Sequence, residues 1–445
     1  MFFGILLLSH LTSHGSLALA QAVGKSGASG QAQAVVASTP QGTWIQAWYS
    51  NQPPRLTGEQ QREIEERTTR SHRSGPISPT TTAPVGTVPG PTAPPLAPPI
   101  SGVSDVSAMP GDFIIFRDSV IPNAVSSFVQ EPSTSANGKN VFQVGNWYAA
   151  RSFDNGATWS FLDPFSIFGP DFCCDQVTVY DPGRDRQFWL LQYGDHLAIA
   201  HSSGTDLFTN WCVYNIDPTW IGQPATTALD YNDLALGTNF LYLTTNIFPA
   251  AGGAGSAILR LPIDALITCG AFGYNYTVHT DSFTFKPVQG AQDVMYWGSN
   301  WGQVDGQSFR VYSWAENSGT YFWFDRTIDP FTFMYRNSGQ NCGSTDGVVT
   351  NWCQFADSRV LSGYRANGIL GFSFNASQGS GFPYSRRVYF RESDIAYLGS
   401  ASLWADWTAI QYLQLTPNAR GHVGGVFAWG GHDNQLLPGH RLAHR

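Results

Sequence analysis

Charged side chains are scarce in this sequence. Aspartate, glutamate, lysine and arginine make up 13% of the 445 residues, and the three lysines are Lys25, Lys139 and Lys286. The formal net charge of −8 is modest, and the second half of the chain contains no basic cluster. Because nucleic-acid binding needs a dense cationic surface, we expect no nucleic-acid partner.

Several other signals are missing. No stretch after the N-terminus is apolar for the ~20 residues that a membrane span requires, so we expect no span in the mature chain. The sequence contains no C-x-x-C spacing, no Gly-rich phosphate loop and no nucleophile elbow. We therefore expect no metal and no cofactor. Convincing amphipathic helices are also absent, which argues against a helical fold.

The cysteines are few but even in number, which is typical of an oxidising compartment. Their positions are Cys173, Cys174, Cys212, Cys269, Cys342 and Cys353. Cys342 and Cys353 are close enough in sequence to close one loop. Cys212 would then join Cys269 between neighbouring repeats, and the two adjacent cysteines would pair with each other, although a vicinal disulfide is strained. Metal ligation is the alternative, but the spacing does not favour it.

The N-terminus has the features of a signal peptide. An apolar run ends in Ala18-Leu19-Ala20, a small-x-small ending that is typical of signal peptidase sites. We predict a signal peptide over residues 1–20, a mature chain that begins at Gln21, and a secreted, extracellular or cell-surface protein. No lysine or arginine precedes the apolar run, so a short buried helix or a misassigned start is the alternative.

Residues 21–110 have the composition of a disordered segment. Residues 21–43 are small and polar, and residues 75–110 are dense in proline and threonine. Such a segment cannot bury enough apolar area to offset the entropy lost on ordering. We predict a disordered leader, which in a secreted protein would serve as an O-glycosylated stalk. At the other end of the chain, residues 436–445 are predicted to be a tail.

The pattern changes at Asp112 and then holds to near the C-terminus. Short runs rich in Val, Ile, Tyr and Phe alternate with Gly, Asn and Asp turns. Each repeat has a polar residue, an apolar strand, a turn and a second strand that ends in asparagine, glycine or an aromatic residue. The repeats start roughly 45 to 65 residues apart, which is the period of propeller blades. We predict an all-β propeller over residues 111–435, with six blades or, if the longest gap hides one, seven. Residues 113–116 would complete the last blade.

The stretch around residue 154 carries a specific motif, Ser152-x-Asp154-x-Gly156-x-Thr158-Trp159. Asp154 can hydrogen-bond the backbone of its own turn, and Gly156 can adopt the positive φ that the turn needs. Thr158 and Trp159 then begin a new strand. The motif resembles the Asp box of sialidases and related β-propellers, and the resemblance implies a sialidase-like fold. In that family the box lies on an outer turn, away from the active site.

The resemblance also implies where a sialidase would carry a catalytic arginine. Sialidases open their first blade with an Arg-Ile-Pro tripeptide, whose arginine binds the substrate carboxylate. The corresponding stretch here is Gln130-Glu131-Pro132. A neutral amide at the position of Gln130 cannot supply the bidentate, charge-assisted contact of a guanidinium. We therefore expect no sialidase activity.

Residues that open the innermost strands of a propeller point toward its axis at one end. By this register the central residues are Glu131, Asp175, Asn232, Gln292, Arg359 and Gln411, with Asn146 and Trp147 nearby. Glycosidases use two carboxyls about 5–5.5 Å apart for retention or about 6.5–9.5 Å apart for inversion. Glu131 and Asp175, from adjacent blades, are the candidate catalytic pair, and the others are candidate substrate-binding residues. The alternative is a polar channel that holds structural water or an ion.

Three functions remain open at this point. The first is a secreted propeller that binds a neutral glycan at its central face, and it is favoured because the catalytic arginine is missing. The second is a carbohydrate-active enzyme, a glycoside hydrolase or polysaccharide lyase, that uses Glu131 and Asp175 as acid and base. The third is a non-catalytic surface scaffold. We expect a monomer with a carbohydrate or glycoconjugate ligand. Sequons at Asn275 and Asn375 predict glycosylation if the host glycosylates.

Overall fold

The computed structural model describes residues 27–35, 39–53, 132–169, 172–204, 208–300, 306–335, 353, 356–377, 382–405, 408–430 and 439–444. Within these residues the chain is built almost wholly of strands. The helical elements of this part are three single turns: α3 (Phe165–Phe168), α4 (Ile263–Leu266) and the 3-10 helix η1 (Pro218–Ile221). The all-β class predicted from the sequence is confirmed.

The described strands from residue 133 onward form six antiparallel units. The first contains β5 (Ser133–Asn137), β6 (Asn140–Gly145), β7 (Tyr148–Ser152) and β8 (Ser160–Leu162). The second contains β9 (Phe172–Asp181), β10 (Arg186–Tyr193), β11 (Leu197–Ser203) and β12 (Asn210–Ile216). The third contains β13 (Ala228–Leu236), β14 (Phe240–Phe248), β15 (Gly255–Pro262) and β16 (Tyr274–His279).

The remaining three units follow the same pattern. The fourth contains β17 (Lys286–Gln289), β18 (Val294–Ser299), β19 (Ser308–Ala315) and β20 (Thr320–Thr327). The fifth contains β21 (Val360–Ala366), β22 (Ile369–Ala376), β23 (Tyr384–Arg391) and β24 (Tyr397–Leu403). The sixth contains β25 (Ala409–Pro417), β26 (Val423–Gly430) and β27 (Gly439–His444). The last strand corrects the predicted C-terminal tail, because it pairs with β26.

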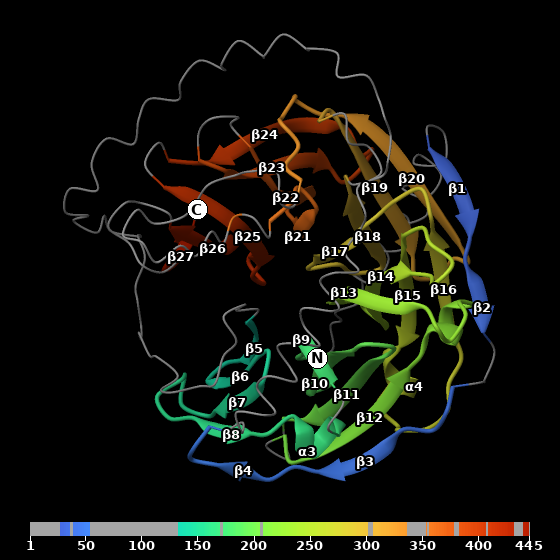
Figure 1. Cartoon of the computed structure of the whole chain (residues 1–445), viewed down its shortest axis with the longest axis vertical. Coiled ribbons are helices and arrows are strands. Elements are labelled where there is room, and N and C mark those ends of the chain that lie inside the picture. The colour runs from blue at the N-terminus through green and yellow to red at the C-terminus, as the bar shows by residue number, and fades with distance from the viewer. Residues whose placement is uncertain are drawn as a thin grey trace, which may run out of the picture.

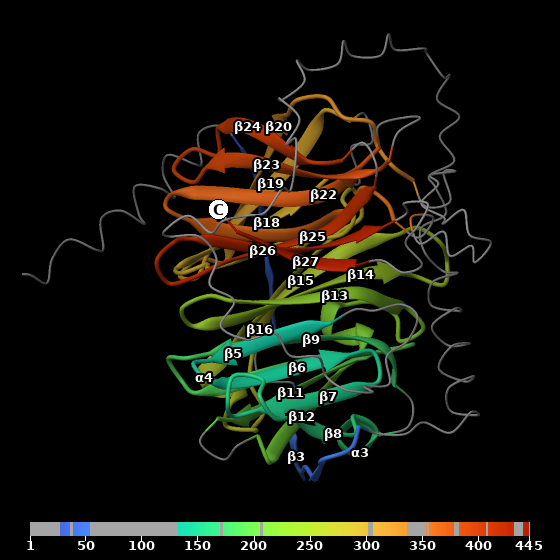
Figure 2. The ribbon, with the colours of Figure 1, turned by 90° about the vertical axis from the view of Figure 1, so that its left-hand side faces the viewer.

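The units are arranged around a common centre as in a β-propeller (Figure 1). The first strand of each unit is innermost, and successive inner strands contact one another from β5 through to β25. The strands run between the two faces of the molecule (Figure 2). One pair of inner strands, β17 and β21, is joined in parallel, so these two begin at the same face. We call the end at which the inner strands begin the hub face, and the opposite end the far face.

Large aromatic side chains fill the space between neighbouring units. Phe142 of the first unit meets Trp189 of the second edge-to-face at 5.4 Å between ring centres. Phe309 of the fourth unit lies 5.2 Å from Phe372 of the fifth. A four-stranded sheet by itself would leave such rings exposed on at least one face. The units therefore stack because stacking removes both of their apolar faces from water.

The N-terminal part of the chain forms four short strands around the outside of the propeller. They are β1 (Ala28–Gln31), β2 (Gln33–Val35), β3 (Thr43–Gln46) and β4 (Tyr49–Ser50). Each pairs antiparallel with the fourth strand of one unit: β4 with β8, β3 with β12, β2 with β16, and β1 with β20. We call residues 28–50 the N-terminal strap; it runs along the right and lower rim in Figure 1.

The strap corrects the prediction of disorder for this part of residues 21–110. The prediction considered only the apolar area that small residues can bury. It ignored the row of unpaired N–H and C=O groups that each outer strand presents at its edge. A strap strand satisfies those groups with its own backbone, so it can be ordered with little apolar side-chain area. The proline- and threonine-rich residues 75–110 lie outside the described residues.

A disulfide lies beneath the strap. Cys212 on β12 is bonded to Cys269, which follows α4, so the bond joins the second and third units as predicted. Gly42 of the strap packs directly on it, and the Gly42 N–H donates to the carbonyl of Cys269 at 3.1 Å. Cys353 is also disulfide-bonded. Its predicted partner Cys342, like the side chains of Cys173 and Cys174, lies outside the described residues, so those pairings stay predictions.

The strap is fixed at its other end beside the Asp-box turn. The Arg151 guanidinium lies over the ring of Tyr49, 3.4 Å from its centre. The Tyr49 hydroxyl donates to the carbonyl of Phe208 at 2.9 Å. Arg151 is the residue before Ser152, so the turn between β7 and β8 and the strap strand β4 are held by adjacent side chains.

The Asp box itself is a closed set of hydrogen bonds between β7 and β8. The Asp154 carboxylate accepts from the Thr158 N–H and hydroxyl and from the Ser152 hydroxyl, each at 2.8 Å. Ser152 Oγ accepts from the Gly156 N–H at 2.8 Å, and Gly156 has φ +80°. Trp159 packs against a small apolar cluster of Tyr148, Ala150 and Phe161. The hydrogen bond from the Thr158 backbone is the main reason why the pKa of Asp154 falls to about 2.

Gly42→Ala tests how tightly the strap lies on the disulfide. An added Cβ would meet Cys212 Sγ at 2.4 Å and Tyr214 Cζ at 2.8 Å. We expect a loss of about 1–3 kcal/mol in the free energy of unfolding, measured by urea titration, because such a site cannot take another methyl group without moving. Gly194→Ala is the matched control, since its Cβ would meet nothing within 4 Å. Equal stability of the two variants would show that the strap is not packed on the disulfide.

Asp154→Asn tests the Asp-box turn through its pH dependence. The pKa of Asp154 is lowered in the folded protein, from 3.8 to about 2. The carboxylate therefore stabilises the fold above about pH 4, and this contribution is lost as the pH falls through the folded pKa. We expect the wild-type protein to melt above the variant at pH 6 and the difference in Tm to shrink toward pH 2. A difference that is constant with pH would contradict this.

Candidate functional site at the hub face

Buried side-chain amides join consecutive units near the hub face. Four of them lie at the ends of second strands: Gln192, Asn246, Asn300 and Asn375, each at most 1% exposed. Gln192 Nε2 donates to Asp230 Oδ1 at 2.9 Å in the third unit. Asn246 bonds to both the hydroxyl and the N–H of Thr284, at 3.1 and 2.9 Å, just before the fourth unit.

The next two junctions repeat this arrangement. Asn300 Nδ2 donates to the carbonyl of Ser358 at 2.5 Å, just before β21. Asn375 Oδ1 accepts from the N–H of Tyr412 on β25 at 2.9 Å. We call these four side chains the junction amides. They set the position of the inner strand along its axis in the third to sixth units, each relative to the unit before it. Asn375 is one of the two sequon asparagines, and its complete burial leaves no room for a glycan there.

Charged residues and one tyrosine, on or just before four successive inner strands, gather at the hub face. We call them the hub cluster: Asp175, Asp230, Tyr231, Asp233, Lys286, Asp357 and Arg359. Lys286 Nζ lies 3.0 Å from Asp233 Oδ2. Arg359 grips Asp357 through two nitrogens at 2.6–3.0 Å. The cations of Lys286 and Arg359 each lie 4.7 Å from the centre of the Tyr231 ring, which connects the two ion pairs.

A bulge in β13 places Tyr231 between the two cations. Asp230 pairs with Asn246 and Asp233 with Thr244, so β13 has one residue more than β14 in this stretch. Tyr231 has φ +53°, an uncommon value for a bulky residue. Bulges of this kind re-aim a side chain, and strained backbone is often found at functional sites.

The pKa shifts follow from this geometry. Burial alone would lower the pKa of Lys286, but the negative charge of Asp233 leads the effects that raise it overall. Burial likewise opposes the charge of Arg359, yet Asp357 raises its pKa. Burial raises the pKa of Tyr231 against the influence of both cations. These shifts keep Lys286 and Arg359 charged and Tyr231 neutral at physiological pH.

Two members of this region have hydrogen-bonding capacity that no described residue uses. Asn232, on β13 between Tyr231 and Asp233, is 5% exposed, and neither Oδ1 nor Nδ2 has a partner among the described residues. Asp175 Oδ1 is buried and has no partner among them either. Leaving a buried polar group unpaired costs about 1–3 kcal/mol, so these atoms are candidates for binding a ligand or water.

The structure brings together some of the predicted site residues. Asp175, Asn232 and Arg359 all lie on or beside inner strands at the hub face, within or adjacent to the hub cluster. Glu131 and Gln130 lie outside the described residues, so the pairing of Glu131 with Asp175 stays a prediction. Ser133, the first residue of β5, does contact the second unit, since its hydroxyl accepts from the N–H of Thr178 at 3.0 Å.

Three predicted binding residues are buried, which differs from what a ligand contact would need. Trp147 is 1% exposed in the apolar core between the first two units. Asn146 is buried beside it, at the position that corresponds to the junction amides. Gln411 is fully buried, with Nε2 3.6 Å from Met334 Sδ. The repeat pattern identified these positions correctly as central or strand-terminal. It could not show that their side chains are buried by packing against neighbouring residues.

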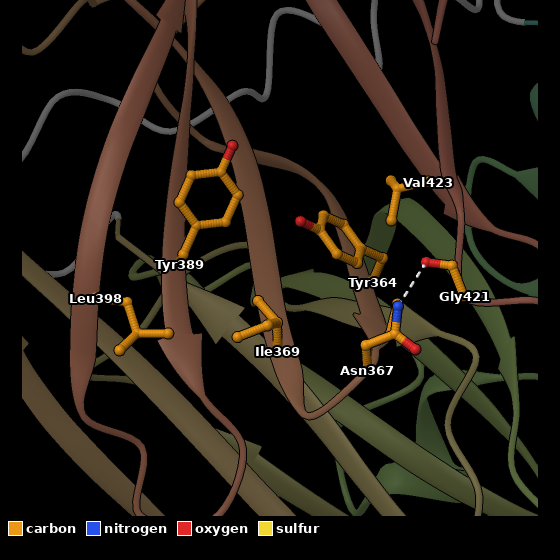
Figure 3. Close-up of a pocket in the computed structure, with 8 residues that line it drawn as sticks. Tyr364, Asn367, Ile369, Tyr389, Leu398, Gly421 and Val423 are labelled. Atoms are coloured by element: carbon orange, nitrogen blue, oxygen red, sulfur yellow. Dashed lines mark hydrogen bonds between the residues drawn. The ribbon is translucent and has the colours of Figure 1, made fainter. Parts of the chain in front are cut away.

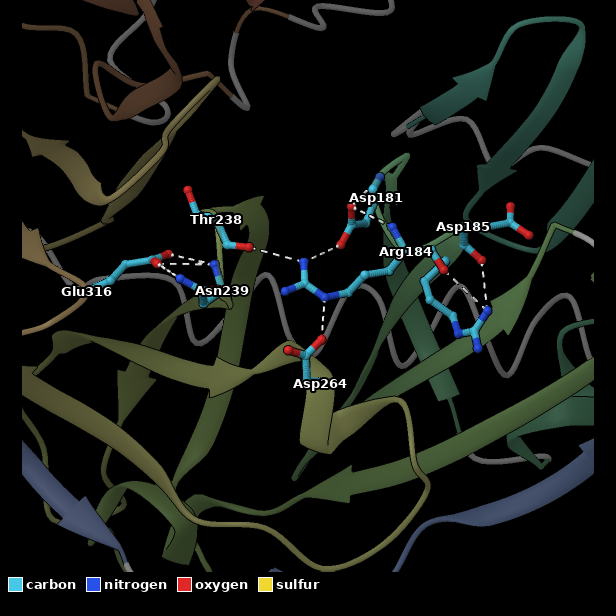
Figure 4. Close-up of polar contacts among 9 residues, drawn as sticks. Asp181, Arg184, Asp185, Thr238, Asn239, Asp264 and Glu316 are labelled. Atoms are coloured by element: carbon cyan, nitrogen blue, oxygen red, sulfur yellow. Dashed lines mark hydrogen bonds and ion pairs between the residues drawn. The ribbon is translucent and has the colours of Figure 1, made fainter. Parts of the chain in front are cut away.

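Gln292 is the largest error, because it lies at the far face. It follows β17, and its carbonyl accepts from the N–H of Thr238 at 3.3 Å. Thr238 belongs to a polar network between far-face turns (Figure 4). In that network Arg184 contacts the Thr238 carbonyl at 3.1 Å and Asp264 at 2.5 Å, and Glu316 accepts from the Asn239 backbone and side chain. β17 is only four residues long. The sequence analysis therefore took a residue after its C-terminal end, and not its first residue, as the start of the fourth unit.

The sequence analysis missed five members of the hub cluster: Asp230, Tyr231, Asp233, Lys286 and Asp357. Two signals were available: the run Asp230-Tyr231-Asn232-Asp233 interrupts an apolar strand, and Lys286 is one of three lysines in the chain. Within the described residues no group of His, Cys, Asp and Glu side chains is arranged to hold a metal ion. No helix among them is long and apolar enough to cross a membrane.

Neither a protein-family model nor a curated protein matches the sequence. Solved structures with a similar backbone include a neuraminidase-like protein of A/little yellow-shouldered bat/Guatemala/060/2010, with 9% identity, 70% of this chain and 92% of that chain covered, and a TM-score of 0.41. An endo-arabinase from Bacteroides thetaiotaomicron has 12% identity, 61% and 93% coverage, and a TM-score of 0.35. An α-L-arabinofuranosidase from Lactobacillus brevis has 8% identity, 60% and 88% coverage, and a TM-score of 0.33.

Lys286→Met tests the ion pair at the core of the hub cluster. The side chain of Asp233 is only 16% exposed, so the variant leaves a poorly solvated carboxylate without its cation. We expect a loss of about 3–5 kcal/mol in the free energy of unfolding, and recovery of most of it in the double variant Lys286→Met/Asp233→Asn.

The exposed pair Arg391–Asp394 supplies the control, because both side chains are about half exposed. Arg391→Met should cost less than about 1 kcal/mol in the same urea titration. If Lys286→Met were as mild as Arg391→Met, the hub cluster would be well solvated and the account of its burial wrong.

Proposed function

We propose that this protein is a secreted, monomeric β-propeller that binds a neutral glycan over the hub cluster. The observation that carries the proposal is the gathering of carboxylates and a phenol from successive inner strands beside Asn232 and Asp175 Oδ1, whose polar atoms have no hydrogen-bond partner among the described residues. Sugar hydroxyls donate and accept hydrogen bonds, and a few convergent polar groups on a rigid scaffold are what orients such a ligand.

The charge balance of the site supports a neutral ligand. Lys286 and Arg359 are each already paired with a carboxylate, at 3.0 and 2.6 Å. The four carboxylates of the hub cluster outnumber these two cations, so the local field disfavours an anionic sugar. Together with Gln130 at the arginine position of the sialidase signature, this argues against sialidase activity.

A second candidate is a carbohydrate-active enzyme, a hydrolase or lyase. It is favoured by one observation: the buried Asp175 Oδ1 has no hydrogen-bond partner among the described residues, so its hydrogen-bonding capacity is left for a bound sugar. The second carboxyl would be Glu131, as the sequence analysis suggests. Turnover of a chromogenic glycoside or a polysaccharide that is lost in both Asp175→Asn and Glu131→Gln would establish this alternative.

Asn232→Ala tests the binding proposal on a glycan array, with titration calorimetry on any glycan found. We expect at least a tenfold rise in Kd, because 1.4 kcal/mol corresponds to tenfold and one hydrogen bond to a buried amide is worth about that. Gln292→Ala is the matched control: it lies at the far face and uses only its backbone, so its Kd should be that of the wild type.

The thermal stability of both variants should be measured alongside binding, because Asn232 is buried. Unchanged glycan affinity in a folded Asn232→Ala protein would reject the hub face as the binding site. If the wild-type protein neither binds a glycan on the array nor cleaves a glycoside in the screen, both proposed functions are rejected and the non-catalytic surface scaffold remains.

A further inference from the structure

The outer edges of the units fall into two groups. In the first four units the fourth strand carries a strap strand on its outer edge. In the fifth unit β24 pairs with β23 on one side, and no described strand pairs with its other edge. Figure 1 shows β24 at the top of the rim, beyond the end of the strap at β1.

The sequence of β24 does not protect this edge. Its seven residues, Tyr-Leu-Gly-Ser-Ala-Ser-Leu, contain no charged residue and no proline. Leu398 is 45% exposed and sits in a bulge. This bulge is the one feature of the strand that would discourage pairing. Uncharged edges invite another strand to pair with them, so natural proteins usually block or cover them.

The order of the strap strands points to the segment that covers β24. Going toward the N-terminus, the strap passes from the first unit to the second, third and fourth. One further step in the same order leads from the fourth unit to the rim of the fifth. We propose that Gln21-Ala22-Val23 adds an antiparallel strand to the outer edge of β24, extending the strap to a fifth unit.

The sequence of this tripeptide matches a known strap strand. Gln21-Ala22-Val23 is identical to Gln33-Ala34-Val35, which is the whole of β2. β2 pairs antiparallel with residues Tyr274–Tyr276 of β16 through its backbone. The same three residues are therefore able to form a strap strand in this protein.

The connection is long enough to reach. One residue, Ala32, separates β1 from β2, although these strands lie on different units. Four residues, 24–27, separate Val23 from Ala28. In extended conformation this connection spans up to about 17 Å. A step to the fifth unit thus needs no more chain than the strap already uses between units.

The surface beside β24 offers apolar contacts to the added strand. A cavity of about 390 Å³ opens there, and Tyr364, Ile369, Tyr389 and Leu398 line it (Figure 3). The side chains of a strand alternate between its two faces. One of Ala22 and Val23 would therefore lie on the side of this cavity, as Val35 of β2 packs on the apolar core between the second and third units.

Hydrogen exchange of the intact secreted protein tests the proposal. The variant Ala22→Pro/Val23→Pro lacks both N–H groups, so it cannot pair whichever of the two faces β24. We expect the amides of residues 397–403 to exchange at least about tenfold faster than in the wild type, while those of β20 do not change. The control Ala22→Ser/Val23→Thr keeps both N–H groups and should exchange like the wild type. Equal rates in all three proteins would overturn the proposal.

Cross-linking distinguishes this chain's own segment from a second copy. Ala22→Cys is combined in turn with Ser400→Cys and with Ser402→Cys on β24, and disulfides are mapped by mass spectrometry. We expect an intrachain bond in at least one combination, and none with Thr416→Cys, an exposed position on β25. Bonds only between copies, or none in either combination, would overturn the proposal. Neither test depends on glycan binding, so the strand proposal can fail or succeed independently of the proposed function.

Discussion

The register between neighbouring units depends on the junction amides. Sheet faces packed by aromatic rings can slide against one another at small cost, because apolar contacts are not directional. A buried amide has fixed donor and acceptor positions, and leaving it unpaired is expensive. Gln192, Asn246, Asn300 and Asn375 thus fix the position of the inner strand along its axis in the third to sixth units. The positions of the charged groups at the hub face depend on this alignment of the inner strands.

The hub cluster shows this dependence directly. Gln192 bonds to Asp230 at the start of the bulge that carries Tyr231. Asn375 bonds to the carbonyl of Asp357, the residue that Arg359 grips, at 3.1 Å. The same side chains that join the units therefore also position the charged groups. A site held in this way is rigid before any ligand arrives, which reduces the entropy lost on binding.

The outer rim follows a different physical rule. Inside, side chains decide the arrangement; at the rim, unpaired backbone groups do. The strap satisfies those groups with residues such as Ala28, Gly30 and Gln33, whose side chains contribute little. Gly42 and the disulfide Cys212–Cys269 add one tightly packed point to an otherwise backbone-mediated contact. One chain thus uses two kinds of interaction: side chains pack between neighbouring units, and strap backbone pairs with the outer strands of the first four units.

The sequence by itself determined the features whose bonds are local or periodic. The Asp box is complete within eight residues, and every bond that closes it lies inside them. The alternation of strands and turns followed from the residue pattern, and the pairing of Cys212 with Cys269 was predicted from their positions in neighbouring repeats. Asp175, Asn232 and Arg359 were placed at the hub face because an inner-strand position recurs with each repeat.

Only the tertiary structure decided the rest, because it depends on single-residue shifts and on partners far apart in the chain. A shift of one residue turns a strand side chain to the opposite face. The bulge at Tyr231 is such a shift. Gln292 lies at the far face for another reason, because the short β17 begins at Lys286 and has already ended before Gln292. The strap is ordered by edges of strands some 110 to 290 residues away in sequence, which no local composition records.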